Sequence, residues 1–150
     1  MIDLIRTIVG KNTYMTLATA DENGVPWASP VWYATLDCRE FVWASSPQAR
    51  HSRNLAARPE LAIVIFDSRQ SPGTGEGVYV SARAEEVPEA DLDRCLAIYS
   101  RTSEAQRLRA WTRSDVQGTA RHRLYHAIAE AHFVLSARDE RLPVDFAVEV

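Results

Sequence analysis

The sequence has 150 residues, which is long enough for one domain with its own core. Of these residues, 46% are hydrophobic and 25% are charged, an ordinary composition for a globular protein. Its net charge of −3 gives no reason to expect nucleic acid or an acidic membrane surface as a partner. No stretch is long and apolar enough to span a bilayer. The first residues lack the pattern of a signal peptide, so we expect a cytoplasmic protein in which Cys38 and Cys95 are free thiols.

The first part of the chain is predicted to form a short helix followed by an antiparallel meander. Apolar residues recur at helical spacing from Ile2 to Val9, which predicts an amphipathic helix that covers one end of a barrel. Alternating residues then predict strands, with a hairpin turn at Asn23-Gly24. Two prolines in the second strand place it at an edge or a bulge. The predicted strands of this part span residues 14–20, 25–35 and 40–44.

The segment after the third strand has the pattern of an anion site. Pro47 suits the first position of a helix with Ser46 as its N-cap, and the helix should stop before Pro59. A helix start presents free N–H groups and a partial positive charge, which favour phosphate. A capped surface helix with solvated arginines is the alternative interpretation. The residues that would meet an anion here are Ser45, Ser46, Arg50, His51 and Arg53.

The second half of the chain is predicted to hold two more strands, late helices and one ambiguous segment. The glycines at 73, 75 and 77 precede a strand, so they predict a mobile loop and not a nucleotide-binding motif. The periodicity of residues 123–135 fits either a helix or a strand, and their alanines favour a helix. Strands are expected at 61–66 and 78–87, helices at 89–101 and 104–111, a short turn capped at 114–115, and an extended tail at 142–150.

Three segments in this order, MTLATADENGVPWASPVWY, EFVWASSPQARHSRNLAARPELAIVIF and GVYVSARAEEV, resemble the pyridoxamine 5′-phosphate oxidase-like flavoproteins. The resemblance covers about residues 13–87 well and the late helices more loosely. It implies an α+β fold, an antiparallel six-stranded split β-barrel of Greek-key type with flanking helices, as a single FMN-binding domain over residues 1–150. It also resolves residues 123–135 as a strand that closes the barrel.

The resemblance further implies a homodimer that holds two FMN molecules between its subunits. Ser45 and Ser46 match the hydroxyl-bearing strand end at the phosphate, Arg50 matches a basic position there, and His51 stands where many members have a lysine. The second-strand stretch that lies along the isoalloxazine ring corresponds to Pro30, Val31, Trp32 and Tyr33. The family therefore implies the same phosphate site as the local chemistry.

Two departures from the family narrow the expected activity. Ala49 stands where the oxidase has a phosphate-binding serine, and the oxidase's C-terminal Arg-x-His substrate motif is absent, because Leu142 and Pro143 follow Arg141. We therefore do not predict vitamin B6 oxidation. The resemblance leaves an FMN-dependent oxidoreductase with an unknown small-molecule substrate or electron donor and no assigned catalytic residue.

Three alternatives remain open at this point: a non-catalytic flavin protein, a haem-binding or sensing protein, and a deazaflavin-dependent reductase. A deazaflavin has a long anionic tail, for which Arg107, Arg109 and Arg113 are the available basic residues. Haem would need an imidazole, and in a strand His126 and His132 would share a face. No third or fourth ligand accompanies these histidines, so no metal site is predicted.

Overall fold

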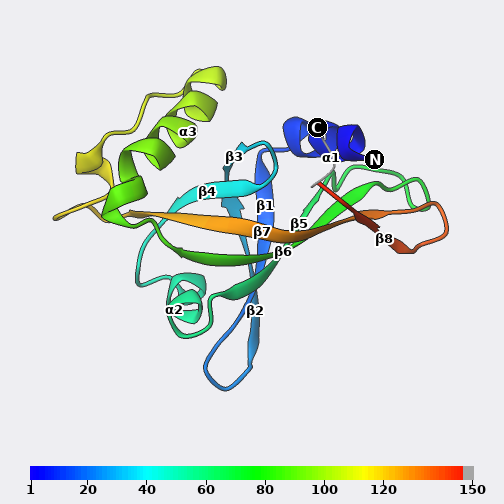
Figure 1. Cartoon of the computed structure of the whole chain (residues 1–150), viewed down its shortest axis with the longest axis horizontal. Helices are drawn as coiled ribbons and strands as arrows, with labels where there is room; N and C mark the ends of the chain where they lie inside the picture. Colours follow the sequence, from blue (N-terminus) through cyan, green and yellow to red (C-terminus); the bar gives the residue numbers. More distant parts are fainter. Residues whose placement is uncertain (147–150) are drawn as a thin grey trace.

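The computed structural model describes residues 1–146 and contains one curved antiparallel sheet with helices at its rims (Figure 1). The strands are β1 (Tyr14–Ala20), β2 (Pro26–Trp32), β3 (Ala34–Leu36), β4 (Glu40–Ser45), β5 (Glu60–Phe66), β6 (Gly77–Glu86), β7 (Arg123–Leu135) and β8 (Arg141–Val144). The helices are α1 (Ile2–Lys11), α2 (Arg50–Ala57) and α3 (Leu92–Ala105), with 3-10 turns η1 (Glu89–Asp91) and η2 (Arg113–Asp115). Within these residues, no helix is both long and apolar enough to cross a membrane.

The strand order confirms the split barrel. Neighbouring strands run β2-β1-β5-β6-β7-β4-β3, and β8 pairs with β7. After the β1–β2 hairpin the chain crosses to the far edge of the sheet, and α2 then carries it back to β5 beside β1. The described part of the chain has eight strands where six were expected. One of the two additional strands arises because the predicted strand 25–35 is interrupted at Tyr33, and the other is β8 in the tail.

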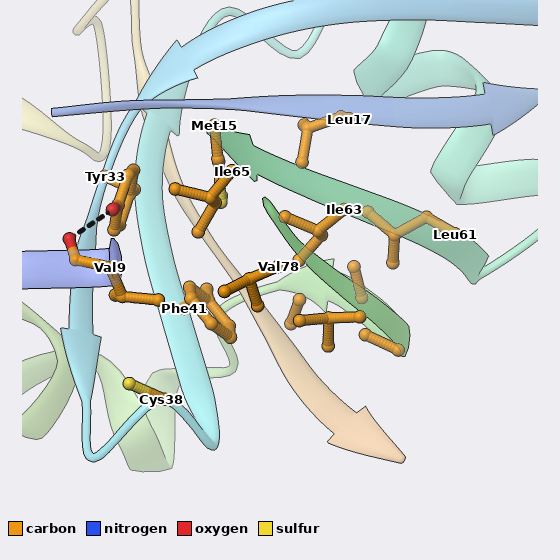
Figure 2. Close-up of a cluster of buried hydrophobic side chains, with 14 of the residues drawn as sticks. Val9, Met15, Leu17, Tyr33, Cys38, Phe41, Leu61, Ile63, Ile65 and Val78 are labelled. Carbon is orange, nitrogen blue, oxygen red and sulfur yellow. Dashed lines mark hydrogen bonds between the residues drawn. The ribbon is translucent and has the colours of Figure 1, made fainter. Parts of the chain in front are cut away.

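The core lies inside the curved sheet and under α1 (Figure 2). Alternate residues of β1 and β5, such as Leu17 and Ile63, point inward and are fully buried. The Tyr33 hydroxyl donates to the Val9 carbonyl at 2.6 Å and also contacts the Asn12 carbonyl at 3.2 Å. Tyr33, at the interruption after β2, therefore holds α1 over the barrel end, where the amphipathic pattern predicts this helix.

The bulge in β7 corrects one expectation. Residues 123–135 do form a strand, but Ser81 pairs with Ala131 while Ala82 pairs with Ala129. Glu130 is thus the extra residue of a β-bulge, and the inward and outward positions exchange there. His126 lies outside the barrel beneath α3, whereas His132 packs on Phe146 near the core. The prediction that these histidines share a face is wrong, because it assumed uninterrupted alternation.

The segment after α3 also differs from the prediction. α3 ends at Ala105, and Arg107 has a left-handed φ of 61°, which no α-helix can contain. The predicted helix at 104–111 is therefore wrong, and the chain runs irregularly to η2. The turn η2 is present but is capped by Thr112 through a capping box with Asp115, and not by Ser114. Of the extended tail, residues 147–150 lie outside the described residues.

The Tyr33 anchor of α1 gives a stability prediction. Tyr33→Phe removes one buried hydrogen bond and leaves a carbonyl of α1 without that donor, so we expect the free energy of unfolding to fall by about 0.5–1.5 kcal/mol. Urea unfolding followed by circular dichroism measures this change. Tyr14→Phe is the matched control, because the Tyr14 side chain is exposed. Equal stability of the two variants would show that the Tyr33 hydroxyl does not hold α1.

Candidate functional site

The turn between β4 and α2 differs from the expected helix start. α2 begins at Arg50, with Ala49 as its N-cap and no side-chain cap. The Ser46 hydroxyl accepts from the Gln48 backbone N–H at 3.1 Å, and the Ser46 carbonyl accepts from the Ala49 N–H at 3.1 Å. Ser46 therefore closes a local turn before the helix. The predictions of Ser46 as N-cap and of Pro47 as the first helical residue are wrong.

The start of α2 nevertheless presents an electropositive end. The first turn has no acidic side chain, and among residues 1–146 no side chain caps its free backbone N–H groups. Such groups carry the positive end of the helix dipole and bind anions. α2 ends at Ala57, before Pro59, as predicted. The local chemistry of the helix start therefore still suits a phosphate, although the helix begins three residues later than expected.

Ser45 and His51 form a buried pair just behind this helix start. The Ser45 hydroxyl lies 2.9 Å from His51 Nε2, and both side chains are buried. Burial lowers the pKa of His51 below its ordinary value of 6.5, so the imidazole is neutral at pH 7. The pair links the end of β4 to the first turn of α2. In this conformation His51 supports the helix start and supplies no positive charge to it.

The exposed cations of α2 are Arg50 and Arg53, one turn apart on the same side of the helix. The Arg50 guanidinium lies over the Trp27 ring of β2, 4.3 Å from its centroid. Arg53 lines a cavity of about 460 Å³ between α2 and β6, together with Ser52 and Tyr125. Within residues 1–146, neither arginine forms an ion pair. Their donors are therefore free to bind an anion.

The second-strand residues occupy three different environments. Val31 packs in the barrel core, Tyr33 holds α1, and the Trp32 indole donates to Gln106 Oε1 at 2.9 Å while its ring meets Tyr99 edge-on. Their side chains thus serve packing. In the described part of the sheet β2 pairs only with β1, so its other backbone edge is unpaired. That edge, and not these side chains, is what the stretch offers to a ligand.

A larger cavity lies elsewhere and has the wrong chemistry for an anion. It has a volume of about 640 Å³ and lies between the loop after β5 and the β7–β8 turn. Its charged lining residues are Asp67, Glu76 and Asp139. The Gln70 side chain braces this loop by donating to the carbonyls of Asp67 and Glu76 at 2.8 and 3.0 Å. Size alone therefore does not identify the phosphate site.

A second group of polar side chains, beneath α3, was not predicted from the sequence. Glu40 Oε2 lies 2.6 Å from His126 Nδ1, and the Arg94 guanidinium donates to both Glu40 oxygens at 2.5 and 3.0 Å. Burial opposes ionisation of Glu40, but the hydrogen bonds from Arg94 and His126 outweigh it and hold the Glu40 pKa below its ordinary value. Cys95, fully buried beside them, has its pKa raised by burial to about 12.

These residues lie far apart in sequence and share no motif spacing. Only the pairing of β4 with β7, which places Val42 opposite His126, and the packing of α3 on β4 bring them together. The one available signal was a glutamate at the start of the predicted strand 40–44; the structure shows that this glutamate is buried, which is rare unless the side chain is paired.

Comparison with known proteins agrees with this architecture. The sequence model of the family described as pyridoxamine 5′-phosphate oxidase matches residues 1–133. A pyridoxine/pyridoxamine 5′-phosphate oxidase of Burkholderia mallei (strain SAVP1) is 30% identical over 132 residues, which are 88% of this chain and 54% of that protein. The chain thus spans about half the length of this curated relative.

Two solved structures share the fold at lower sequence identity. A heme binding protein from Mycobacterium smegmatis superimposes with a TM-score of 0.74 at 23% identity, covering 95% of this chain and 57% of that one. A FAD-binding protein from Mesorhizobium loti superimposes with a TM-score of 0.61 at 19% identity, covering 86% and 89%. The fold and the match over residues 1–133 define a split-barrel protein, and this chain belongs to the pyridoxamine 5′-phosphate oxidase-like family.

The buried His51 gives a pH prediction. Its pKa is lowered in the folded protein, so the unfolded chain binds its proton first as the pH falls below about 6.5, and stability present above that pH is lost. We expect the free energy of unfolding to fall between about pH 7 and about pH 5, and His51→Asn to reduce that slope. Urea titrations across this pH range measure the free energy of unfolding. His122→Asn, at a half-buried position, is the matched control. An unchanged slope in His51→Asn would contradict the buried neutral state.

Proposed function

We propose that the protein binds FMN and acts as an FMN-dependent oxidoreductase on a small molecule, with the phosphate at the start of α2. The observation that carries the proposal is the uncapped helix N-terminus next to Arg50 and Arg53, neither of which has an acidic partner within residues 1–146. Phosphate needs such free N–H groups and guanidinium donors. Membership in the family and the similarity of the fold to a FAD-binding protein support a flavin.

Each residue then has a defined task. Arg50 and Arg53 bind the phosphate, while Ser46 and the turn after β4 shape its surroundings. The buried Ser45–His51 pair positions the helix start from behind. The free backbone edge of β2 near Val31, Trp32 and Tyr33 lies along the ring. The flavin supplies the hydride or electron transfer, and the chain binds and orients it.

FMN suits these residues better than a deazaflavin. The alternative requires basic residues for a long anionic tail, but Arg109 pairs with Asp115 at 3.0 Å and Arg113 pairs with Asp93 at 2.8 Å. Two of the three candidate arginines are thus already neutralised. Arg50 and Arg53 suffice for a single phosphate, which is what FMN carries.

Haem binding is the second candidate, supported by the similarity of the fold to a heme binding protein. It requires an accessible imidazole, and in this chain His126 and His132 are buried, the latter bonded to the Cys38 carbonyl at 2.7 Å. The half-exposed histidine is His122, which packs against Trp111. An absorption spectrum of the purified protein separates the two candidates, because flavin bands support the first and a Soret band the second.

The phosphate assignment predicts the effect of one substitution. Arg50→Ala should weaken FMN affinity by roughly 1.5–3 kcal/mol, or roughly 10- to 150-fold, because it removes a charged hydrogen-bond donor. Fluorescence titration with FMN measures the affinity, and Arg101→Ala, on the exposed face of α3, is the control. Equal affinities of the two variants would remove Arg50 from the site.

We also propose that the protein is a homodimer with the flavin between its subunits, in the cytoplasm, where both buried cysteines stay reduced. Tyr14 and Phe66 support an interface, since both are at least half exposed and the register that pairs Thr16 with Val64 places them opposite each other. Sedimentation at micromolar concentration should then show no monomer, and Phe66→Glu should produce one. A wild-type monomer that still binds FMN would contradict the interface.

A further inference from the structure

The cluster beneath α3 has the composition of a metal site. Glu40, Cys95 and His126 are all buried, with exposed fractions of 6%, 0% and 5%. One ligand atom of each, the Glu40 Oε2, the Cys95 Sγ and the His126 Nδ1, lies within 4.8 Å of the other two. Thiolate, imidazole and carboxylate together are ligands that suit Zn²⁺. We propose that these three side chains form a site for a Zn²⁺-like divalent transition-metal ion.

The distances fit a tetrahedral ion with one small movement. Zn²⁺ bound at its usual ligand distances needs ligand atoms about 3.4–3.6 Å apart. The Cys95 Sγ lies 3.7 Å from Glu40 Oε2 and 3.9 Å from His126 Nδ1, close to that requirement. Only the Glu40–His126 pair, at 2.6 Å, must open, by about 0.8 Å. A hydrogen bond now joins these two side chains, and an ion would replace it.

The surrounding residues complete the site in the way metal centres require. The opposite ring nitrogen, His126 Nε2, faces Glu85 Oε1 at 3.1 Å, the arrangement in which a carboxylate orients a ligating histidine. Arg94 donates to Glu40 Oε1 at 2.5 Å and to Oε2 at 3.0 Å, so an ion at Oε2 would replace the second of these hydrogen bonds while the first still holds the carboxylate. The Arg94 side chain is 47% exposed, which leaves room for its Nη2 to turn away from Oε2 as an ion enters.

The donor atoms also suit a divalent ion. A carboxylate oxygen faces each nitrogen of His126, at 2.6 and 3.1 Å, and the Cys95 sulfur lies 3.7 Å from Glu40 Oε2. A metal-bound cysteine is a thiolate, so binding of the ion would release the proton of the Cys95 thiol, and the thiolate and the Glu40 carboxylate would offset the two charges of the ion. Within residues 1–146 three side chains form the cluster, so a fourth position is left for water.

Cobalt(II) titration of the purified wild-type protein tests the proposal. Any flavin that purifies with the protein is left bound during the titration. We expect one equivalent to produce a thiolate-to-cobalt charge-transfer band and visible bands of tetrahedral intensity, both lost when Zn²⁺ is added. Cys38→Ser is the matched control and should keep the charge-transfer band, since Cys38 lies outside the cluster. Absence of the band in the wild-type protein would overturn the proposal.

Substitutions then test each ligand. Cys95→Ser should abolish the charge-transfer band, and His126→Gln should abolish stoichiometric binding, with circular dichroism confirming that each variant is folded. Glu85→Gln should weaken binding by roughly 10- to 100-fold, as removal of the partner of a ligating histidine does. Glu86→Gln, the neighbouring exposed position, should leave it unchanged. A band that persists in folded Cys95→Ser would place the cobalt elsewhere and overturn the proposal.

Discussion

The long strand β7 is the constraint on which the rest of the structure depends. It pairs with β6, β4 and β8 and therefore links both halves of the barrel to the tail. Its bulge at Glu130 reverses the two faces, so the first half presents His126 to α3 and the second half turns Val134 into the core. Tyr125 and Ala127 of the first half also line the core, so one strand supports the hydrophobic core along its length and the polar cluster beneath α3 at one end.

In the proposed anion site, the residues of one helical turn have different roles. His51, which the family resemblance places at the phosphate, is buried and neutral against Ser45. Arg50 and Arg53 remain on the exposed side of the helix and supply its guanidinium groups. The proposed phosphate affinity should therefore rest on the guanidiniums, while the pH dependence of the helix start rests on the imidazole behind them.

Sequence reasoning predicted what depends on local pattern and missed what depends on register. The α1 lid, the strand at 14–20 and the stop before Pro59 follow from periodicity and proline, and the structure confirms them. The start of α2 was wrong because the Ser46 hydroxyl closes a turn in place of capping the helix. The face of His132 was wrong because no local signal reveals a bulge. The cluster around Glu40 was missed because its members meet only through tertiary packing.

The free edge of β2 has a consequence for how this protein avoids polymerising. Residues two apart in a strand direct their N–H groups to the same side of the strand. Pro26 and Pro30 have no backbone N–H group. On that side only Ala28 and Trp32 remain as donors, so the edge offers an incomplete template to an incoming strand. The barrel can therefore stay open here, next to Arg50 and Trp27, without recruiting another chain into an extended sheet.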